Sequence, residues 1–289
     1  MRIVNHGGRL GLATQDRWVD VETASAGRFS ADVQAIFPRW AEFTSWAYGV
    51  DASAGAPIDP EGLEAPVPRP PQIFAIGLNY RAHAAESGLQ LPDAPFVFTK
   101  FPSSVTGPYT RIELPSDAVD FEAELVAVIG AEARNVSAAD AWRYIAGLTI
   151  GQDLSDRDLQ LSGPAPQQFS LGKSRPGFTP IGPVLVTVDE FDDPDDLELR
   201  CTLSGAEMQK TRTSDLIFGV PRIVEYLSAI LPLLPGDLIF TGTPSGIGWA
   251  RDPQRFIGPD DELVTRVECI GEMRHHFTSN SPRTATTNH

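Results

Sequence analysis

Two glutamates lie two residues apart in the stretch VDFEAELVAVIG, residues 119–130. Alternate residues of a β-strand share a face, so Glu122 and Glu124 should point in the same direction. The residues that follow, Leu125 to Ile129, are apolar on both faces, which is typical of a strand buried on both sides. Because an unpaired buried carboxylate costs several kcal/mol, either this end of the strand is solvated or the two glutamates hold a cation between them.

A third carboxylate, Asp153, closes the apolar stretch GLTIGQD, which also has the pattern of a buried strand. Taken alone, Asp153 is equally well explained as a turn former. Together with Glu122 and Glu124 it completes a set of oxygen ligands without histidine or cysteine. Such a set favours a hard cation, Mg²⁺ first with Mn²⁺ or Ca²⁺ as alternatives, and disfavours zinc.

A histidine and a glutamate, His83 and Glu86, lie three residues apart in NYRAHAAE, residues 79–86. On a helix this spacing places both side chains on one face. A carboxylate beside an imidazole orients the ring and raises its basicity, as a general base requires, whereas the alternative is an exposed pair without a function. His83 is the only histidine between His6 and His275, so any imidazole chemistry in this part of the chain depends on it.

Two glycine-containing stretches, LGKS and TGTPSGIG, invite a phosphate-binding interpretation. A P-loop requires glycine at position 167, where the chain has Gln167, and the glycines at 242, 246 and 248 do not match the dinucleotide fingerprint. The sequence therefore excludes both nucleotide motifs. Backbone N–H groups of the second stretch could still hold a substrate carboxylate, with the hydroxyl of Thr243 adding to them.

The composition limits the partners. A net charge of −15 over 289 residues argues against nucleic acid and anionic membranes. An anionic substrate would need a local positive centre, which a metal ion provides. The N-terminus lacks a signal-peptide pattern, and no run approaches the length of a membrane span, so we expect a cytoplasmic protein. Cys201 and Cys269 lie in strand-like segments, and we expect both to be buried free thiols.

Strands dominate the pattern of the chain and helices are few, which predicts an α+β fold. We expect a small N-terminal α+β domain with a Pro-rich linker in residues 1–70, a catalytic domain in 71–277 and a disordered tail in 278–289. The linker character is strongest over Asp51 to Gln72. Helices are predicted from Ser30 to Trp46, interrupted near Pro38, and from about Ser214 to Leu231.

The order of seven motifs resembles that of the fumarylacetoacetate hydrolase family. The motifs are NYRAHAAE, FVFTK, DFEAELVAVIG, GQDLSDRDLQ, GKS, TSDLIFGVPRIVEYLS and LLPGDLIFTGTPSGIG. The resemblance covers about residues 71–277 and is strongest to the smaller bacterial members. These include acylpyruvate hydrolases, fumarylpyruvate hydrolases, oxaloacetate decarboxylases and hydroxyhepta-diene-dioate isomerases. It implies a β-rich mixed-sheet roll for the catalytic domain, a homodimer and a place in aromatic catabolism.

The resemblance also implies roles for particular residues. Mg²⁺ would be bound by Glu122, Glu124 and Asp153. His83 and Glu86 would form a catalytic dyad, and Lys173 would be the active-site lysine. Substrate contacts would come from Gln160 and Thr243.

The implied activity is Mg²⁺-dependent hydrolysis of a C–C bond in a 2,4-dioxo acid, such as an acylpyruvate or fumarylpyruvate, through a metal-stabilised enolate. The same site would serve an oxaloacetate decarboxylase or a 2-hydroxyhepta-2,4-diene-1,7-dioate isomerase, because each reaction forms the same kind of enolate. The alternative from another class is a catalytically silent protein that binds a metal and a small anionic 2-oxo acid. The intact dyad and lysine favour an enzyme.

Overall fold

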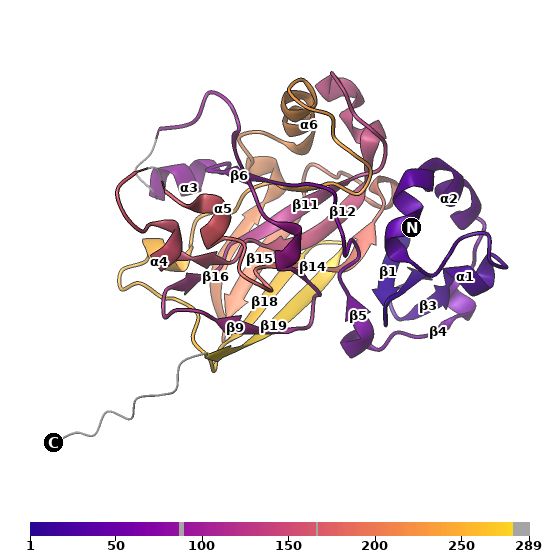
Figure 1. Ribbon diagram of the computed structural model, residues 1–289, viewed down its shortest axis with the longest axis horizontal. Coiled ribbons are helices and arrows are strands. Elements are labelled where there is room, and N and C mark those ends of the chain that lie inside the picture. The colour runs from indigo at the N-terminus through magenta and orange to yellow at the C-terminus, as the bar shows by residue number, and fades with distance from the viewer. Residues whose placement is uncertain (87–89, 166, 280–289) are drawn as a thin grey trace.

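The chain folds around two large β-sheets in the computed structural model, which describes residues 1–86, 90–165 and 167–279 (Figure 1). The larger sheet contains β1 (Arg2–His6), β2 (Arg9–Ala13), β3 (Arg17–Asp20), β4 (Ala56–Pro57), β5 (Leu63–Glu64), β6 (Ile73–Gly77), β7 (Phe96–Thr99), β8 (Val105–Thr106), β11 (Ala123–Ile129), β12 (Ile145–Gln152), β14 (Thr179–Val186) and β17 (Leu238–Phe240). The second contains β9 (Arg111–Leu114), β15 (Glu198–Leu203), β16 (Ala206–Arg212), β18 (Glu262–Val267) and β19 (Gly271–Ser279). A small ladder pairs β10 (Val119–Asp120) with β13 (Ser155–Asp156).

Both large sheets are mixed. Most neighbouring strands are antiparallel, while β6 runs parallel to β17, β8 to β14 and β9 to β19. The α-helices in the described residues are short: α1 (Val21–Ala24), α2 (Trp40–Ala47), α3 (Arg81–Glu86), α4 (Arg157–Gln160), α5 (Phe169–Gly172) and α6 (Val220–Ser228). Two 3₁₀ helices of seven residues span Val33–Arg39 and Ala138–Tyr144. The predicted α+β class with mixed sheets is confirmed.

Strands β11 and β12 form the centre of the larger sheet. Every residue of both strands is buried, as the run of apolar residues on both faces predicts. Leu125, Ala127 and Ile129 face a core shared with the second sheet, whereas Val126 and Val128 face the core that includes Phe37 and Phe43 of the N-terminal segment. Layers on both sides therefore exclude water from the two strands whose ends carry the predicted site residues.

The N-terminal strands extend the larger sheet, since β1 pairs with both β2 and β14. Figure 1 shows this segment, with α1 and α2, on the side of the molecule away from α3, α4 and α5. The stretch Asp51 to Gln72 is not a structureless linker, because β4 pairs with β3 and β5 pairs with β1. Two-residue strands are too short to produce an alternating pattern, which is why the sequence did not reveal them. The domain boundary near residue 70 stays a prediction.

The two predicted helices were wrong in extent. The later one begins at Val220 rather than near Ser214, because Gly219 is its N-cap and Pro221 belongs in the first turn, where its missing N–H does no harm. Upstream, Ile217 donates its N–H to the carbonyl of Asn79 (2.7 Å) instead of to a helical partner. The helix predicted from Ser30 to Trp46 is instead two helices, the 3₁₀ helix Val33–Arg39 and α2. The side chain of Asp32, rather than Ser30, caps the start of the first.

Two smaller expectations also need correction. Cys201 is buried as predicted, but Cys269 is exposed, because it lies in the turn between β18 and β19 with φ of +62°. The predicted disordered tail falls outside the described residues except for Thr278 and Ser279, which belong to β19. Within the described part of the chain, no helix combines the length and apolar character that crossing a membrane requires.

Candidate active site

Three carboxylates meet where β11 and β12 pair. Ala123 lies opposite Gln152 in this antiparallel ladder, so Glu122 and Glu124 at one strand's start reach Asp153 at the other strand's end. The backbone N–H of Asp153 donates to the carbonyl of Glu122 (2.9 Å). One oxygen from each of the three side chains lies within 4.8 Å of the others, and all three residues are buried. The interpretation as a solvated strand end is therefore wrong.

Cationic side chains compensate two of these carboxylates. Lys173 Nζ donates to Glu122 Oε2 and to Asp153 Oδ2, at 2.7 Å each. Lys100 Nζ donates to Asp153 Oδ1 (2.5 Å), and Arg157 Nη2 donates to Glu122 Oε1 (2.7 Å). Burial by itself would raise the pKa of Glu122, but Lys173 and Arg157 outweigh it and lower that pKa to about 2. Glu122 is thus held as a carboxylate.

Glu124 has a different environment. Oε2 of Glu124 accepts a hydrogen bond from the backbone N–H of Gly242 (2.6 Å). No cationic side chain of the described residues pairs with Glu124. Burial, together with repulsion from Asp153 and Glu122, raises the pKa of Glu124 well above its usual value. A bound cation would relieve both effects. The oxygen-only donors and this uncompensated carboxylate fit a hard metal ion.

The imidazole of His83 lies beside the carboxylate of Glu86 on α3. His83 Nδ1 is 3.2 Å from Glu86 Oε2, as the three-residue spacing predicts. A carboxylate only accepts hydrogen bonds, so Nδ1 carries the hydrogen and Nε2 is left as the basic nitrogen. The start of α3 is anchored by Asn79, whose buried side chain donates to the carbonyls of Phe218 (2.9 Å) and Thr241 (2.7 Å).

The turn TGTPSGIG holds carboxylates of the protein itself. Gly242 N–H donates to Glu124, and Gly246 N–H donates to the two oxygens of Glu86 at 3.0 and 3.2 Å. Gly248 N–H donates to Asp120 (2.7 Å). Gly246 has φ of +103°, and a Cβ there would lie 2.1 Å from the carbonyl oxygen of Met208. These N–H groups therefore position glutamates and an aspartate, where the sequence suggested a substrate carboxylate.

A cavity of about 450 Å³ opens over these groups. Of the eight predicted site residues, six line it: His83, Glu122, Glu124, Gln160, Lys173 and Thr243. The other two lie behind the wall, Asp153 fully buried and Glu86 beside His83.

Gln160 and Thr243 are themselves held by neighbours. Gln160 Oε1 accepts a hydrogen bond from Arg157 (2.7 Å), and the Thr243 hydroxyl donates to the carbonyl of Ala123 (3.0 Å). Their roles as substrate contacts stay predictions.

Sequence reasoning predicted Lys173 but missed the other two cations of the site. Lys100 and Arg157 are buried, and Arg157 also pairs with Asp120 (2.7 Å). Both cations lay inside motifs quoted for the resemblance, FVFTK and GQDLSDRDLQ. A lysine that closes an apolar strand, as Lys100 does, is the signal that could have revealed a buried partner for Asp153.

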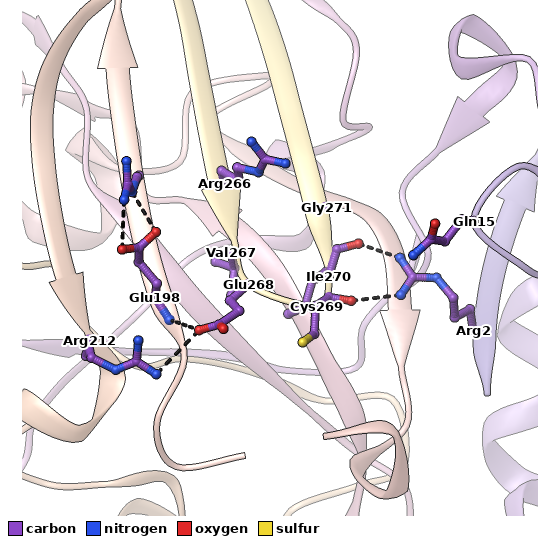
Figure 2. Close-up of a pocket in the computed structure, with 11 residues that line it drawn as sticks. Arg2, Gln15, Glu198, Arg212, Arg266, Val267, Glu268, Cys269, Ile270 and Gly271 are labelled. Carbon is purple, nitrogen blue, oxygen red and sulfur yellow. Dashed lines mark hydrogen bonds and ion pairs between the residues drawn. The ribbon is translucent and has the colours of Figure 1, made fainter. Parts of the chain in front are cut away.

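A second, larger cavity of about 770 Å³ contains none of the predicted residues. Figure 2 shows its wall at the turn between β18 and β19. Arg2 donates to the carbonyls of Cys269 and Ile270 there, while Arg212 pairs with Glu268 at 3.4 Å. The smaller cavity is the candidate active site, because the carboxylates, the dyad and the buried lysine converge on it.

Comparison with known proteins agrees with this geometry. The family described as fumarylacetoacetate (FAA) hydrolase C-terminal matches residues 72–278. The chain belongs to the fumarylacetoacetate hydrolase family. Among curated relatives, the human mitochondrial oxaloacetate tautomerase FAHD2A is 38% identical over 209 residues, which are 72% of this chain and 66% of that protein. The matched region spans about two thirds of the length of that relative.

Solved structures of family members have the same fold. A Mycobacterium smegmatis protein with the provisional name HpcE is 50% identical, with a TM-score of 0.89 over 97% of this chain and 100% of its own. The 2-hydroxyhepta-2,4-diene-1,7-dioate isomerase of Mycobacterium marinum is 36% identical, with a TM-score of 0.67 over 79% and 83% of the two chains. Maleylpyruvate hydrolase from Sphingobium sp. SYK-6, in complex with manganese (II) ion and pyruvate, is 26% identical, with a TM-score of 0.80 over 97% and 100%.

Proposed function

We propose that this family member is a Mg²⁺-dependent hydrolase that cleaves a C–C bond in a 2,4-dioxo acid. The observation that carries the proposal is the shared cavity, in which His83 faces the same space as Glu122, Glu124 and Lys173. A general base beside a cluster of oxygen ligands is the combination that water-dependent cleavage of such an acid requires.

The metal would be held by Glu122, Glu124 and Asp153, whose oxygen atoms already converge. When bound there, the ion would supply positive charge that favours the enolate form of a 2-oxo acid. The related maleylpyruvate hydrolase was solved with manganese (II) ion and pyruvate, which supports a divalent cation in this family. We propose Mg²⁺ as the ion used here, with Mn²⁺ as a working substitute.

His83 and Glu86 would activate water. With Nδ1–H directed at Glu86, Nε2 of His83 accepts a proton from a water molecule, whose oxygen attacks the distal carbonyl. Glu86 stabilises the imidazolium that results. The C–C bond then breaks, its electron pair goes to the 2-oxo acid fragment, and that carbon takes up the proton. One water and one 2,4-dioxo acid give a carboxylic acid and pyruvate or a related 2-oxo acid.

Lys173, Gln160 and Thr243 would position the reactants. The ammonium of Lys173 is fixed between Glu122 and Asp153, so it faces the cavity as a stationary positive charge. We propose that it neutralises charge on the substrate. Gln160 and Thr243 line the same space and would contact the substrate from the sides.

A second candidate function is tautomerisation or isomerisation, which the names of two relatives favour, an oxaloacetate tautomerase and a 2-hydroxyhepta-2,4-diene-1,7-dioate isomerase. Decarboxylation of oxaloacetate belongs with them, because it forms the same kind of enolate. Those reactions use the enolate but no attacking water. The discriminating experiment measures pyruvate release from acetylpyruvate, and keto–enol interconversion and decarboxylation of oxaloacetate, with Mg²⁺ present. We expect hydrolysis to dominate. Turnover of oxaloacetate without hydrolysis of acetylpyruvate would favour the second candidate. Metal binding without any turnover would favour a silent binding protein.

We also propose a homodimer, since closed two-fold pairing is the commonest arrangement among soluble oligomers. Light scattering at micromolar concentration should give twice the chain mass of 31.3 kDa, and a monomer mass would contradict it. The cytoplasm stays the predicted location, although the human relative is named as mitochondrial.

A further inference from the structure

We infer that the substrate is a 2,4-dioxo acid whose acyl group is apolar, and that the enzyme discriminates against acyl groups ending in a second carboxylate. This inference rests on the proposed function and narrows its substrate class. It starts from the wall of the cavity beyond the ionic cluster.

Three phenylalanines form that wall. Phe96 and Phe98 come from β7 and Phe169 from α5, and all three line the cavity. Their rings contact one another, with centroids 6.2 Å apart for Phe96 and Phe98, 5.6 Å for Phe96 and Phe169, and 5.7 Å for Phe98 and Phe169. Such contacts between rings make a continuous apolar surface.

The wall extends from the ionic cluster to the mouth of the cavity. The ring of Phe98 lies beside Lys173, with Nζ 5.2 Å from the ring centroid. Phe96 lies at the other end of the wall and is 44% exposed. Trp249, which also lines the cavity, is 42% exposed. Large exposed aromatic side chains around a cavity of about 450 Å³ are typical of a binding surface for an apolar group.

No cation of the described lining is available for a second carboxylate. The candidates are His83, Arg157 and Lys173. His83 and Arg157 each pair with carboxylates of the protein. Lys173 lies between two of the proposed metal ligands, so it faces the 2-oxo acid end of the substrate rather than its far end. Within the stretches of sequence that line the cavity, the undescribed residues are 87–89 and 166, which are Ser, Gly, Leu and Pro and carry no charge. A dicarboxylate bound through its 2-oxo acid end would therefore place its far carboxylate against phenylalanine rings without a cationic partner, which is costly.

The test compares three acyl groups that differ in size and in charge. We expect kcat/KM with Mg²⁺ to be highest for benzoylpyruvate, lower for acetylpyruvate and lowest for fumarylpyruvate. The expected ratio of benzoylpyruvate to fumarylpyruvate is about 100-fold, the scale of an unpaired buried charge. A preference for fumarylpyruvate, with acetylpyruvate still hydrolysed, would overturn the inference and leave the proposed function standing.

A binding measurement distinguishes the inference about the apolar site from the proposed hydrolase function. Neither 2-oxo-4-phenylbutanoate nor 2-oxoadipate has a 4-oxo group, so neither is a substrate for hydrolysis. With Mg²⁺ present, calorimetry should give tighter binding of the phenyl acid. That result would support an apolar site even if no acylpyruvate were hydrolysed, in which case only the proposed function would fail. Tighter binding of 2-oxoadipate would overturn the inference.

Variants of the wall provide a matched control. Phe96→Ala should lower the ratio of kcat/KM for benzoylpyruvate to that for acetylpyruvate by about 10-fold. Phe101 has the same 44% exposure but does not line the cavity, so Phe101→Ala should leave that ratio unchanged. Phe96→Lys should raise fumarylpyruvate relative to benzoylpyruvate, and the gain should shrink as salt is added. Equal effects of Phe96→Ala and Phe101→Ala would contradict a role for the wall.

Discussion

The molecule contains two clusters in which cations meet carboxylates, and they differ in burial. The buried cluster contains Lys100, Arg157 and Lys173 with Asp120, Glu122, Glu124 and Asp153. The exposed cluster contains Arg200 and Arg212 with Glu198 and Glu268, on the wall of the larger cavity (Figure 2). The side chains of Arg212 and Glu268 are 45% and 48% exposed, whereas those of Lys100 and Asp153 are fully buried.

The difference in burial between the two clusters indicates which of them is suited to binding a metal ion. Water and salt screen exposed pairs, which contribute little to stability. In the buried cluster each ionised group depends on a particular partner, and Glu124 lacks a cationic one among the described residues. That imbalance is what makes the buried cluster a candidate metal site, and the predictions below test it.

Metal binding should show the largest effect. Chelation by EDTA should abolish hydrolysis, and Mg²⁺ or Mn²⁺ should restore it. Glu124→Gln should weaken metal binding by roughly 100-fold or more, measured by calorimetry. The same change should raise the unfolding temperature of the metal-free protein, because burial and the neighbouring carboxylates disfavour ionised Glu124, a cost that the neutral glutamine does not have. Glu268→Gln in the exposed cluster should alter neither quantity. Activity that survives exhaustive chelation would show that the metal proposal is wrong.

The dyad has an exposed counterpart that serves as its control. His83 lines the cavity and lies 3.2 Å from Glu86. His276, in contrast, lies 3.6 Å from Glu262, and half of its side chain is exposed. His83→Ala should lower kcat for hydrolysis by about 10² to 10⁴ because it removes the general base, and Glu86→Gln should change kcat in the same direction. His276→Ala should leave kcat unchanged. Decarboxylation of oxaloacetate should fall less than hydrolysis in His83→Ala, and an equal fall would argue against water activation.

Replacing one cationic side chain in each cluster measures how much that cluster contributes to the free energy of unfolding. Lys100→Met leaves Asp153 with one lysine partner fewer in a fully buried site, and we expect a loss of about 3 to 5 kcal/mol in the free energy of unfolding. Arg212→Met should cost less than about 1 kcal/mol. Urea unfolding of both variants at one pH measures the difference. Similar losses would mean that burial does not separate the clusters.

Burial without a charged partner is a third case, represented by His275. Its side chain is fully buried, Nε2 donates to the carbonyl of Gly107 (3.1 Å), and Nδ1 has no partner. Burial lowers the pKa of His275 to about 4. Between about pH 6.5 and pH 4 the unfolded chain takes up a proton that the folded protein does not, so stability falls as the pH falls through this window.

The loss of unfolding free energy that His275 causes between pH 6.5 and pH 4 should reach at most about 3 kcal/mol. His275→Gln keeps a donor toward Gly107 and should flatten this part of the pH dependence, measured by urea unfolding at pH 7 and pH 4.5. His276→Gln is the control and should keep the wild-type slope. An unchanged slope in His275→Gln would assign the acid loss of stability to other groups.

The sequence by itself determined the features that depend on short-range periodicity. Alternation along a strand placed Glu122 and Glu124 on one face, and three-residue spacing placed His83 beside Glu86. The apolar runs identified the buried strands β11 and β12. These inferences succeed because backbone geometry repeats every two or 3.6 residues whatever the rest of the chain does.

Only the tertiary structure decided which distant groups meet. Lys100 pairs with Asp153 across 53 positions, and Gly246 holds Glu86 across 160. The start of α6 depends on Ile217 bonding to Asn79, and β1 joins the sheet through β14. No local period encodes such partners, because they follow from the order in which strands pair. Burial then gives those contacts their energy, and it is burial that distinguishes the candidate active site from the exposed cluster.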